Sequence, residues 1–433
     1  MKKTIVLLVL ATLLGVKLNA ETTRFYVVNE TWNGASLLKA HIWGVGVAET
    51  TFPGISMTRM GEENVHFIDI ENAPETFNMI VSNCNPDGGA KYDGDANQTV
   101  NITVSKSTPV IYVYGSGDGK RSVSSVALTY KLVRISGGNI QKVYQMELTD
   151  GKFVGTIDLQ NNSYDGHEYF IAPKYSLFNS DSRISWSLIY RPHDMHTSIG
   201  FTTVAESSET GRVYNENWSQ SSWKLTARAM YTFTFRANQD GTNPYFSITP
   251  HFDKTIGSEG YSTFSYTNNV AIPDGVDVYY ANKATETSVS LTKVTASNGI
   301  PADAGVIIKG TAGAQAQFTP QAEATTLSGN LLSGSGAEGT DITANDFILG
   351  GTGDDFGFHQ VSVAGKLGAY KAYLPAANVP GGAAKFSIVF DETNGIATLS
   401  HERTDNVYYD LQGRRVMNPT KGLFIVNGKK VIK

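Results

Sequence analysis

Tyr231-Thr232-Phe233-Thr234-Phe235 alternates aromatic and polar side chains. Successive side chains of a strand point to opposite faces, so this run predicts a strand with one aromatic, buried face. Similar short alternating or β-branched runs occur at 24–28, 39–43, 65–70, 77–81, 99–104, 110–114, 126–135, 143–148, 153–159, 169–172, 245–249, 276–280, 289–294, 305–309 and 386–390. Turn-forming residues separate them, and no helical period persists after the N-terminal leader. The sequence therefore predicts an all-β fold.

Length and composition predict several β domains in tandem. At about 150 residues per domain, 433 residues suggest roughly three domains. The chain has 43 Gly, 21 Tyr and 20 Phe, and only 17% charged residues, which favours strands and tight turns. We expect β-sandwich domains at 21–106 and 107–252, with a linker or turn at 115–119. An accessory β domain should follow at 253–398, and a small C-terminal β-hairpin unit at 399–433, where Asn427-Gly428 is a hairpin signal.

The N-terminus has the pattern of a signal peptide. Met1-Lys2-Lys3 is positive, residues 4–16 are nearly all apolar, and Leu18-Asn19-Ala20 precedes the polar Glu21. A membrane anchor is the alternative, but the apolar run is shorter than the roughly 20 residues that a spanning helix needs. We expect residues 1–20 to be removed after Ala20, which leaves an exported chain without a membrane span, either secreted or at the cell surface.

Charge and cysteine content exclude some classes of protein. The formal net charge is −5, and loss of the leader with its three lysines would make it −8. Nucleic-acid binding is disfavoured because no basic stripe is available for the phosphates. Cys84 is the single cysteine, so no intrachain disulfide can form and hydrophobic cores must supply the stability.

Catalytic motifs and cofactor motifs are missing. The chain has no Gly-x-Ser-x-Gly, no His-Glu-x-x-His and no phosphate-binding loop, and it has no strand–helix unit that carries a dinucleotide fingerprint. His193 and His196 have the spacing of two metal ligands, with a polar loop as the alternative. Residues 93–97 imitate half of a calcium loop, but Gln98 and Val104 stand where glycine and glutamate belong. We expect no cofactor, no metal and no enzyme activity, although a glycosidase with two carboxylates about 5 to 9.5 Å apart stays an open alternative.

Aromatic residues in the first domain suggest sugar binding. If the runs at 24–28 and 39–43 pair, Tyr26, His41 and Trp43 can share one face. A sugar ring offers C–H groups to aromatic faces and hydroxyls to amides and imidazoles. Core packing is the alternative role for each aromatic side chain.

This region resembles the starch-binding modules of carbohydrate-binding family 26. The shared elements, in order, are a strand followed by Asn29-x-x-Trp32, a strand ending in Trp43, Pro53-Gly54 with Met57 nearby, and Gln98-Thr99 before the last strand. The resemblance implies that Tyr26 and Trp43 form the platform for an α-1,4-glucan, with His41 and Gln98 as hydrogen-bonding partners. Trp32 would face either the core or the sugar. His41 departs from the family, which often has an aromatic residue there.

The later domains resemble parts of other secreted proteins. Residues 107–252 are similar to sandwich domains of outer-membrane starch-binding proteins of Bacteroidetes, and Trp186, Trp218 and Trp223 are candidates for a second platform. Residues 253–398 resemble an accessory domain of that phylum. The tail resembles its C-terminal sorting domains, which implies recognition by an export machinery or surface attachment, with a simple terminal hairpin as the alternative.

The expected function is therefore non-catalytic binding of starch-like α-glucan near the cell surface. A single module of this kind should bind with a dissociation constant on the order of 10 μM to 1 mM. The alternative is a surface adhesin or structural protein that binds protein or host glycan and uses its aromatic residues as core. The two hypotheses differ in whether Tyr26 and Trp43 lie exposed side by side.

Overall fold

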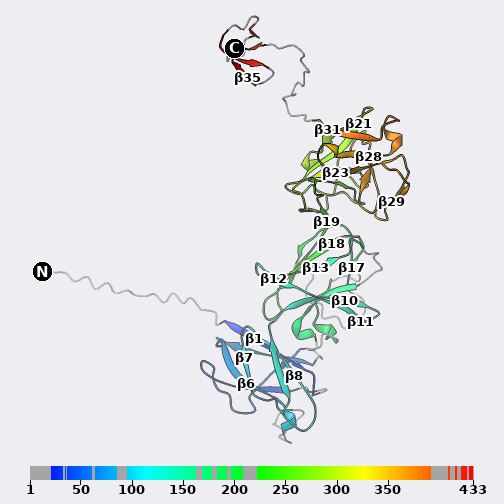
Figure 1. Ribbon diagram of the computed structural model, residues 1–433. Helices are drawn as coiled ribbons and strands as arrows, with labels where there is room; N and C mark the ends of the chain where they lie inside the picture. Colours follow the sequence, from blue (N-terminus) through cyan, green and yellow to red (C-terminus); the bar gives the residue numbers. More distant parts are fainter. Residues whose placement is uncertain are drawn as a thin grey trace, which may run out of the picture.

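The computed structural model confirms the all-β prediction and the tandem β-sandwich domains. The residues that it describes are 21–32, 35, 37–60, 64–84, 95–161, 168–177, 183–192, 197–207, 222–391, 408–409, 415–416, 421–426 and 429–432. Within them the helices are 3-10 turns of three residues: η1 (Asp95–Asn97), η2 (Lys174–Ser176), η3 (Trp186–Leu188), η4 (Ala296–Asn298), η5 (Gly353–Asp355) and η6 (Ala376–Asn378). Figure 1 shows the first three β domains following one another along the molecule.

The first domain is a sandwich of two sheets. One has the order β4 (Thr58–Arg59), β5 (Val65–Glu71), β1 (Thr22–Asn29), β8 (Val110–Tyr114), β9 (Ser122–Val126). The other has the order β3 (Ile55–Ser56), β2 (Leu38–Trp43), β6 (Thr76–Asn83), β7 (Ile102–Ser105). Apolar side chains that alternate along the strands, such as Phe25 and Val27 of β1 and Phe77 and Met79 of β6, fill the space between the sheets.

The expected boundary between residues 106 and 107 falls inside this sandwich. Strand β8 pairs in parallel with β1, and its Ile111 and Val113 belong to the core of the first domain. The stretch 115–119, expected as a linker or turn, is the turn between the antiparallel strands β8 and β9. The sequence-based boundary is therefore corrected to the end of β9 at Val126.

The second sandwich follows directly. Its first sheet has the order β11 (Asn139–Gln145), β10 (Tyr130–Ser136), β14 (Glu168–Pro173), β17 (Trp223–Leu225), β15 (Thr197–Ile199). Its other sheet has the order β12 (Glu147–Thr149), β13 (Lys152–Asp158), β18 (Met230–Arg236), β19 (Tyr245–Thr255), β16 (Val204–Ser207). The alternating run of residues 231–235 lies in β18, and Tyr231, Phe233 and Phe235 are buried as the alternation predicts.

An aromatic stack joins the first and second domains. Tyr26 of β1 lies against Tyr175 of η2 with ring centroids 4.0 Å apart and an interplanar angle of 13°. Tyr112 of β8 donates its hydroxyl hydrogen to the carbonyls of Lys174 (2.8 Å) and Leu177 (2.9 Å). These side chains belong to one buried cluster with residues of both domains, so the outer face of the β1 sheet is covered by the second domain.

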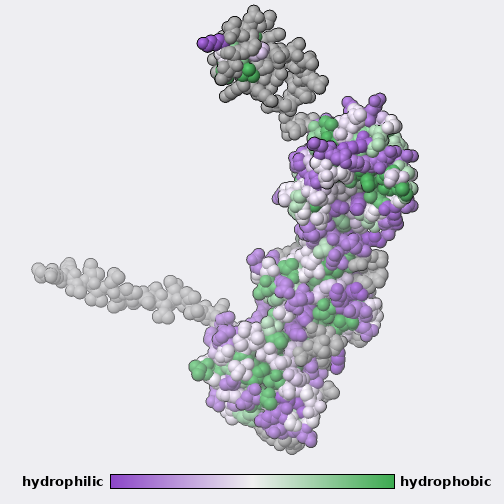
Figure 2. Space-filling view, viewed as in Figure 1, coloured by the Kyte–Doolittle hydropathy of each residue, from purple (hydrophilic) through white to green (hydrophobic). Residues whose placement is uncertain are grey.

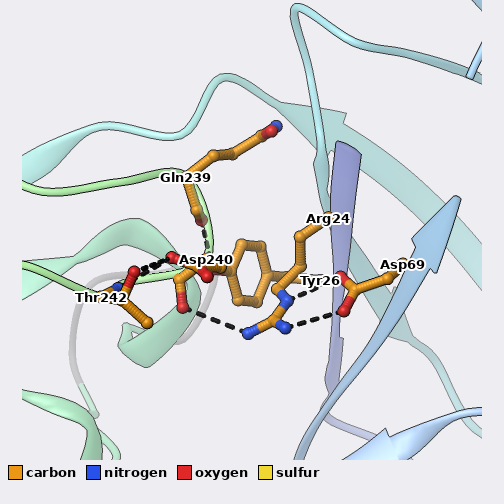
Figure 3. A network of polar contacts seen from close by, with 6 residues as sticks. All are labelled: Arg24, Tyr26, Asp69, Gln239, Asp240 and Thr242. Carbon is orange, nitrogen blue, oxygen red and sulfur yellow. Dashed lines mark hydrogen bonds and ion pairs between the residues drawn. The ribbon is translucent and has the colours of Figure 1, made fainter. Parts of the chain in front are cut away.

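Polar contacts complete this joint, as Figure 3 shows. Arg24 forms a bidentate pair with Asp69 at 2.7 and 2.8 Å, and its third nitrogen donates to the Asp240 carbonyl at 3.1 Å. The Tyr26 hydroxyl donates to the Gln239 carbonyl at 2.5 Å. Within its own loop, the Asp240 carboxylate accepts from the backbone N–H and hydroxyl of Thr242. The loop that connects β18 and β19 is therefore held against β1.

Strand β19 continues across the expected boundary between residues 252 and 253. Its last residues pair with β24 (Gln315–Phe318) of the third domain. The main sheet of that domain has the order β20 (Tyr261–Phe264), β23 (Val306–Lys309), β21 (Asp277–Ala284), β22 (Ser288–Lys293), β31 (Lys385–Asp391), β28 (Gly357–Gln360), β27 (Phe347–Gly350). Two short pairs accompany it, β25 (Ser333–Gly334) with β30 (Ala372–Tyr373) and β26 (Thr340–Ile342) with β29 (Gly365–Leu367). One buried apolar cluster spans the second and third domains, so they share a core.

The C-terminal unit is a small antiparallel sheet. Its order is β33 (Arg415–Val416), β32 (Tyr408–Tyr409), β34 (Leu423–Val426), β35 (Lys429–Ile432). Strands β34 and β35 pair on either side of Asn427-Gly428, as the hairpin signal predicts. In the described part of the chain, no helix has the length and hydropathy needed to cross a membrane.

Tyr26 is expected to stabilise the joint mainly through its ring. Replacing Tyr26 by Ala should lower the free energy of unfolding by about 3 to 5 kcal/mol, as for other buried aromatic truncations, because it leaves Tyr175 without its stacking partner. Tyr26→Phe keeps the ring and should cost only about 1 kcal/mol for the lost hydrogen bond. Urea unfolding followed by fluorescence measures both, and equal losses for the two variants would contradict a ring-based joint.

Candidate functional site

The candidate site lies on the outer face of the sheet that contains β2. Along β2, Leu38, Ala40 and Ile42 point into the core. Because strand side chains alternate, His41 and Trp43 point away from the core, and both are half-buried. The second domain covers the other sheet, so this face is where the first domain can present aromatic side chains to a ligand.

His41 and Trp43 form a stacked pair. Their ring centroids are 5.0 Å apart with an interplanar angle of 24°. Thr50 fixes His41, because its hydroxyl lies 3.0 Å from His41 Nδ1 and also accepts the Ile42 backbone N–H at 3.0 Å. The hydroxyl can donate to or accept from the imidazole. Within the described residues His41 Nε2 and Trp43 Nε1 have no hydrogen-bond partner, so both are available to a ligand hydroxyl.

Phe52 adds a third ring to this pair. Its centroid lies 5.5 Å from that of His41, at an interplanar angle of 70°. The turn that carries Phe52 depends on Gly54, which has a φ of 104° and lies against β2. A Cβ at Gly54 would be only 1.9 Å from the Ala40 carbonyl oxygen, so glycine is required for this close approach. Trp43, His41 and Phe52 together are called the aromatic row below.

Polar side chains border the aromatic row on the neighbouring strands. Asn78 of β6 pairs with Trp43, and its amide oxygen accepts a hydrogen bond of 3.0 Å from the Thr103 hydroxyl. Gln98 pairs with Ser82 on the far side of β6, and its amide donates to Asp95 at 3.2 Å. Gln98 therefore shares the sheet with the aromatic row but lies across β6 from it.

Apolar surface surrounds the same sheet. Val45 after β2 is 94% exposed, and Ile55 of β3 and Val100 before β7 are also exposed. Figure 2 shows hydrophobic surface on the first domain over the region where Figure 1 places β6 and β7. An aromatic row with polar edges and apolar surroundings is suited to a ligand that has both C–H and hydroxyl groups.

Tyr26 does not belong to this site, which corrects the expected platform of Tyr26 and Trp43. Tyr26 is completely buried, in contact with Tyr175, on the face of the other sheet. Alternation places Tyr26 on one face of β1 but cannot say that β1 and β2 lie in different sheets. The two strands pair with different partners, and the face of β1 that carries Tyr26 is used for the domain joint.

Trp32 is a core residue, which decides between its two expected roles. It is 7% exposed and packs in the core of the first domain. The Asn29 side chain accepts the Trp32 backbone N–H at 2.9 Å and donates to its carbonyl at 2.8 Å, so the Asn-x-x-Trp motif is a local turn. Trp32 Nε1 donates to the Ala96 carbonyl in η1, just before Gln98. Trp32 thus positions the Gln98 segment from inside.

The other candidate sites receive no support from the described residues. Trp223 is 1% exposed in the second core, and Trp186 packs against Phe170 with a centroid distance of 5.6 Å. Trp218, His193 and His196 lie outside the described residues. Among the residues described, no cluster of three His, Cys, Asp or Glu side chains could hold a metal ion. Asp95, from the calcium-like segment, instead accepts from Gln98 and lies 4.0 Å from Lys120 Nζ.

Sequence reasoning missed Phe52 and Thr50. Both precede Pro53-Gly54, which belongs to the family resemblance but implies no role for the residues before it. Neither lies in an alternating strand, so periodicity gave no signal for them. The Pro-Gly pair did mark a tight turn after β2, and a turn that close to Trp43 is the one available pointer to side chains beside it.

Replacing Gly54 by Ala should displace the turn that carries Phe52. Because the added methyl meets the backbone of β2, we expect a loss of about 2 kcal/mol or more in the free energy of unfolding. Gly119→Ala is the matched control, since a Cβ there meets nothing within 4 Å and should change stability by less than about 0.5 kcal/mol. Chemical unfolding measures both variants, and equal effects would contradict the close approach.

Comparison with known proteins finds no relative of this chain. No protein-family model matches the chain, and neither a curated protein nor a solved structure matches it significantly. The roles given to Trp43, His41 and Phe52 rest on their geometry in this molecule.

Proposed function

We propose that the first domain binds α-glucan, a starch-like chain of sugars, through the aromatic row, without catalysing its breakdown. The observation that carries the proposal is the half-buried stack of His41 and Trp43 on the outer face of β2, with Phe52 beside it. Aromatic rings in a core need no outward-facing position. Three rings on an outer face expose apolar surface to water, which is unfavourable unless a ligand covers them.

The geometry also suggests how a sugar would bind. His41 covers one face of the Trp43 indole, so a sugar ring can stack only on the opposite face or contact the ring edges. Trp43 Nε1 can donate to a hydroxyl, and His41 Nε2 can donate to or accept from one. Asn78 lies next to Trp43 across the strands. A contact of this size supports a weak site, in keeping with a dissociation constant on the order of 10 μM to 1 mM.

A surface adhesin or structural protein is the second candidate, and the position of Tyr26 favours it. The aromatic pair expected for glucan binding does not exist, because Tyr26 is used to join two domains. On this alternative the aromatic row would contact a protein or a host glycan. The two functions are distinguished by the ligand that Trp43 contacts.

The place of action is proposed from the sequence. The N-terminal leader and the resemblance of the tail to Bacteroidetes sorting domains favour an exported protein at the cell surface or outside the cell. Three further β units would then hold the binding domain away from the point of attachment. Export or sorting machinery is the proposed partner of the tail.

Glucan binding is tested by affinity electrophoresis of residues 21–433 in gels with and without amylopectin. We expect amylopectin to retard the protein and Trp43→Ala to weaken the interaction by about tenfold or more, because the only indole of the row is lost. The matched control is Tyr245→Ala, since Tyr245 is half-buried in the second domain and stacks on Arg236 at 4.2 Å. It should leave the retardation unchanged.

Two results would count against the proposal. If amylopectin does not retard the wild-type protein, glucan binding is excluded and the adhesin function is left as the candidate. Equal loss of retardation in Trp43→Ala and Tyr245→Ala would mean that glucan binds elsewhere or non-specifically. Circular dichroism of each variant checks that the sheets are intact.

A further inference from the structure

A cavity of about 260 Å³ lies in the third domain, far along the chain from the aromatic row. Tyr261, Ser262 and Thr263 of β20 line it on one side, and Ile348 and Leu349 of β27 on the other. Strands β20 and β27 are the two edges of the seven-stranded sheet, so the cavity lies where the curled sheet brings its edges together. Pockets for drug-sized ligands have volumes of about 300 to 1,000 Å³, so this cavity suits one molecule smaller than those.

Two lysines give the cavity its charge. Lys254 of β19 and Lys371 beside β30 both line it. Within the described residues no carboxylate lies within ion-pair distance of either ammonium group, and the one hydrogen bond of Lys254 Nζ goes to the Tyr370 carbonyl at 3.3 Å. The backbone at Lys371 is fixed, because its carbonyl accepts from Ser265 and Ser335 and its N–H donates to the Ser335 hydroxyl.

The charge of Lys254 is kept at a cost. Burial, together with the Lys371 ammonium, lowers the pKa of Lys254 to about 8. The neighbouring titratable groups on β19 are His251 and Asp253. They interact with each other, because His251 Nδ1 and Asp253 Oδ1 are 2.8 Å apart. The remaining titratable group in the lining is the Tyr261 hydroxyl. An anion placed between the two lysines would offset the desolvation of the Lys254 ammonium and its repulsion by the Lys371 ammonium.

Aromatic and hydroxyl groups line the rest of the cavity. The rings of Tyr261 and Phe356 have centroids 5.1 Å apart at 31°, and both are half-buried. The Thr263 hydroxyl has no hydrogen-bond partner among the described residues. Ring C–H groups can pack on the aromatic wall and hydroxyls can bond to Thr263.

We propose that this cavity binds a carboxylated sugar of monosaccharide size, with its carboxylate between Lys254 and Lys371 and its ring against Tyr261 and Phe356. The site is separate from the aromatic row and does not depend on glucan binding there. It gives the third domain, expected from sequence to be an accessory unit, a ligand of its own.

Calorimetry of residues 21–433 with sodium glucuronate tests the site. We expect glucuronate to bind at least about tenfold more tightly than glucose, which lacks the charge, and than acetate, which lacks the ring. Lys254→Met and Lys371→Met should each weaken binding about tenfold or more, the loss of one charge-assisted hydrogen bond. Lys283→Met is the matched control, because Lys283 is exposed on β21 outside the cavity and should bind like the wild type.

A second measurement uses the unaltered protein, so that a misfolded variant cannot obscure the result. Carboxylate binding favours protonated Lys254, so glucuronate affinity should fall about tenfold between pH 7 and pH 9. At pH 8, calorimetry in two buffers of different ionisation enthalpy should show proton uptake on binding. Absence of glucuronate binding, equal binding of acetate or glucose, or binding without proton uptake would each overturn the proposal.

Discussion

The joint between the first two domains determines which surface of the first domain can bind a ligand. A sandwich has two outer faces, and here the β1 face is filled by Tyr26, Tyr112 and the η2 segment of the second domain. The hydrogen bonds from Arg24 to the Asp240 carbonyl and from Tyr26 to the Gln239 carbonyl hold that face in one orientation. The sheet of β2 and β6 is left to carry the aromatic row. The position of the candidate site thus follows from the use of Tyr26 and Tyr112 in the joint between the domains.

Shared buried apolar surface also fixes the arrangement of the second and third domains. Strand β19 belongs to the second sandwich and pairs with β24 of the third, and a common apolar cluster spans both. A hinge between them would expose that cluster to water, at a cost of roughly 25 cal/mol for each Å² of apolar surface. The second and third domains therefore act as one rod, to which the first is attached through the tyrosine stack. The proposed binding face is therefore held at a fixed place relative to the cavity in the third domain.

Period-two patterns predicted the strands well, because alternation of Tyr231, Phe233 and Phe235 reports burial of one face directly. They also placed His41 and Trp43 on one outer face of β2. They failed at Tyr26, since alternation says which side of a strand a residue occupies but not what lies against that side. Phe52 reaches the site through a turn, and β8 returns to the first sandwich by parallel pairing with β1. Both depend on tertiary contacts, which a local sequence pattern does not encode.

The central claim is that Trp43, among the tryptophans of this chain, is the one that meets glucan. Selective nitrogen-15 labelling of the five tryptophans in residues 21–433, followed by titration with maltoheptaose, observes each indole N–H separately. Trp32 and Trp223 are buried in separate cores and serve as internal references. The account predicts that the Trp43 signal shifts on titration while those of Trp32 and Trp223 stay in place. A Trp43 signal that does not move while the protein binds the sugar would contradict it.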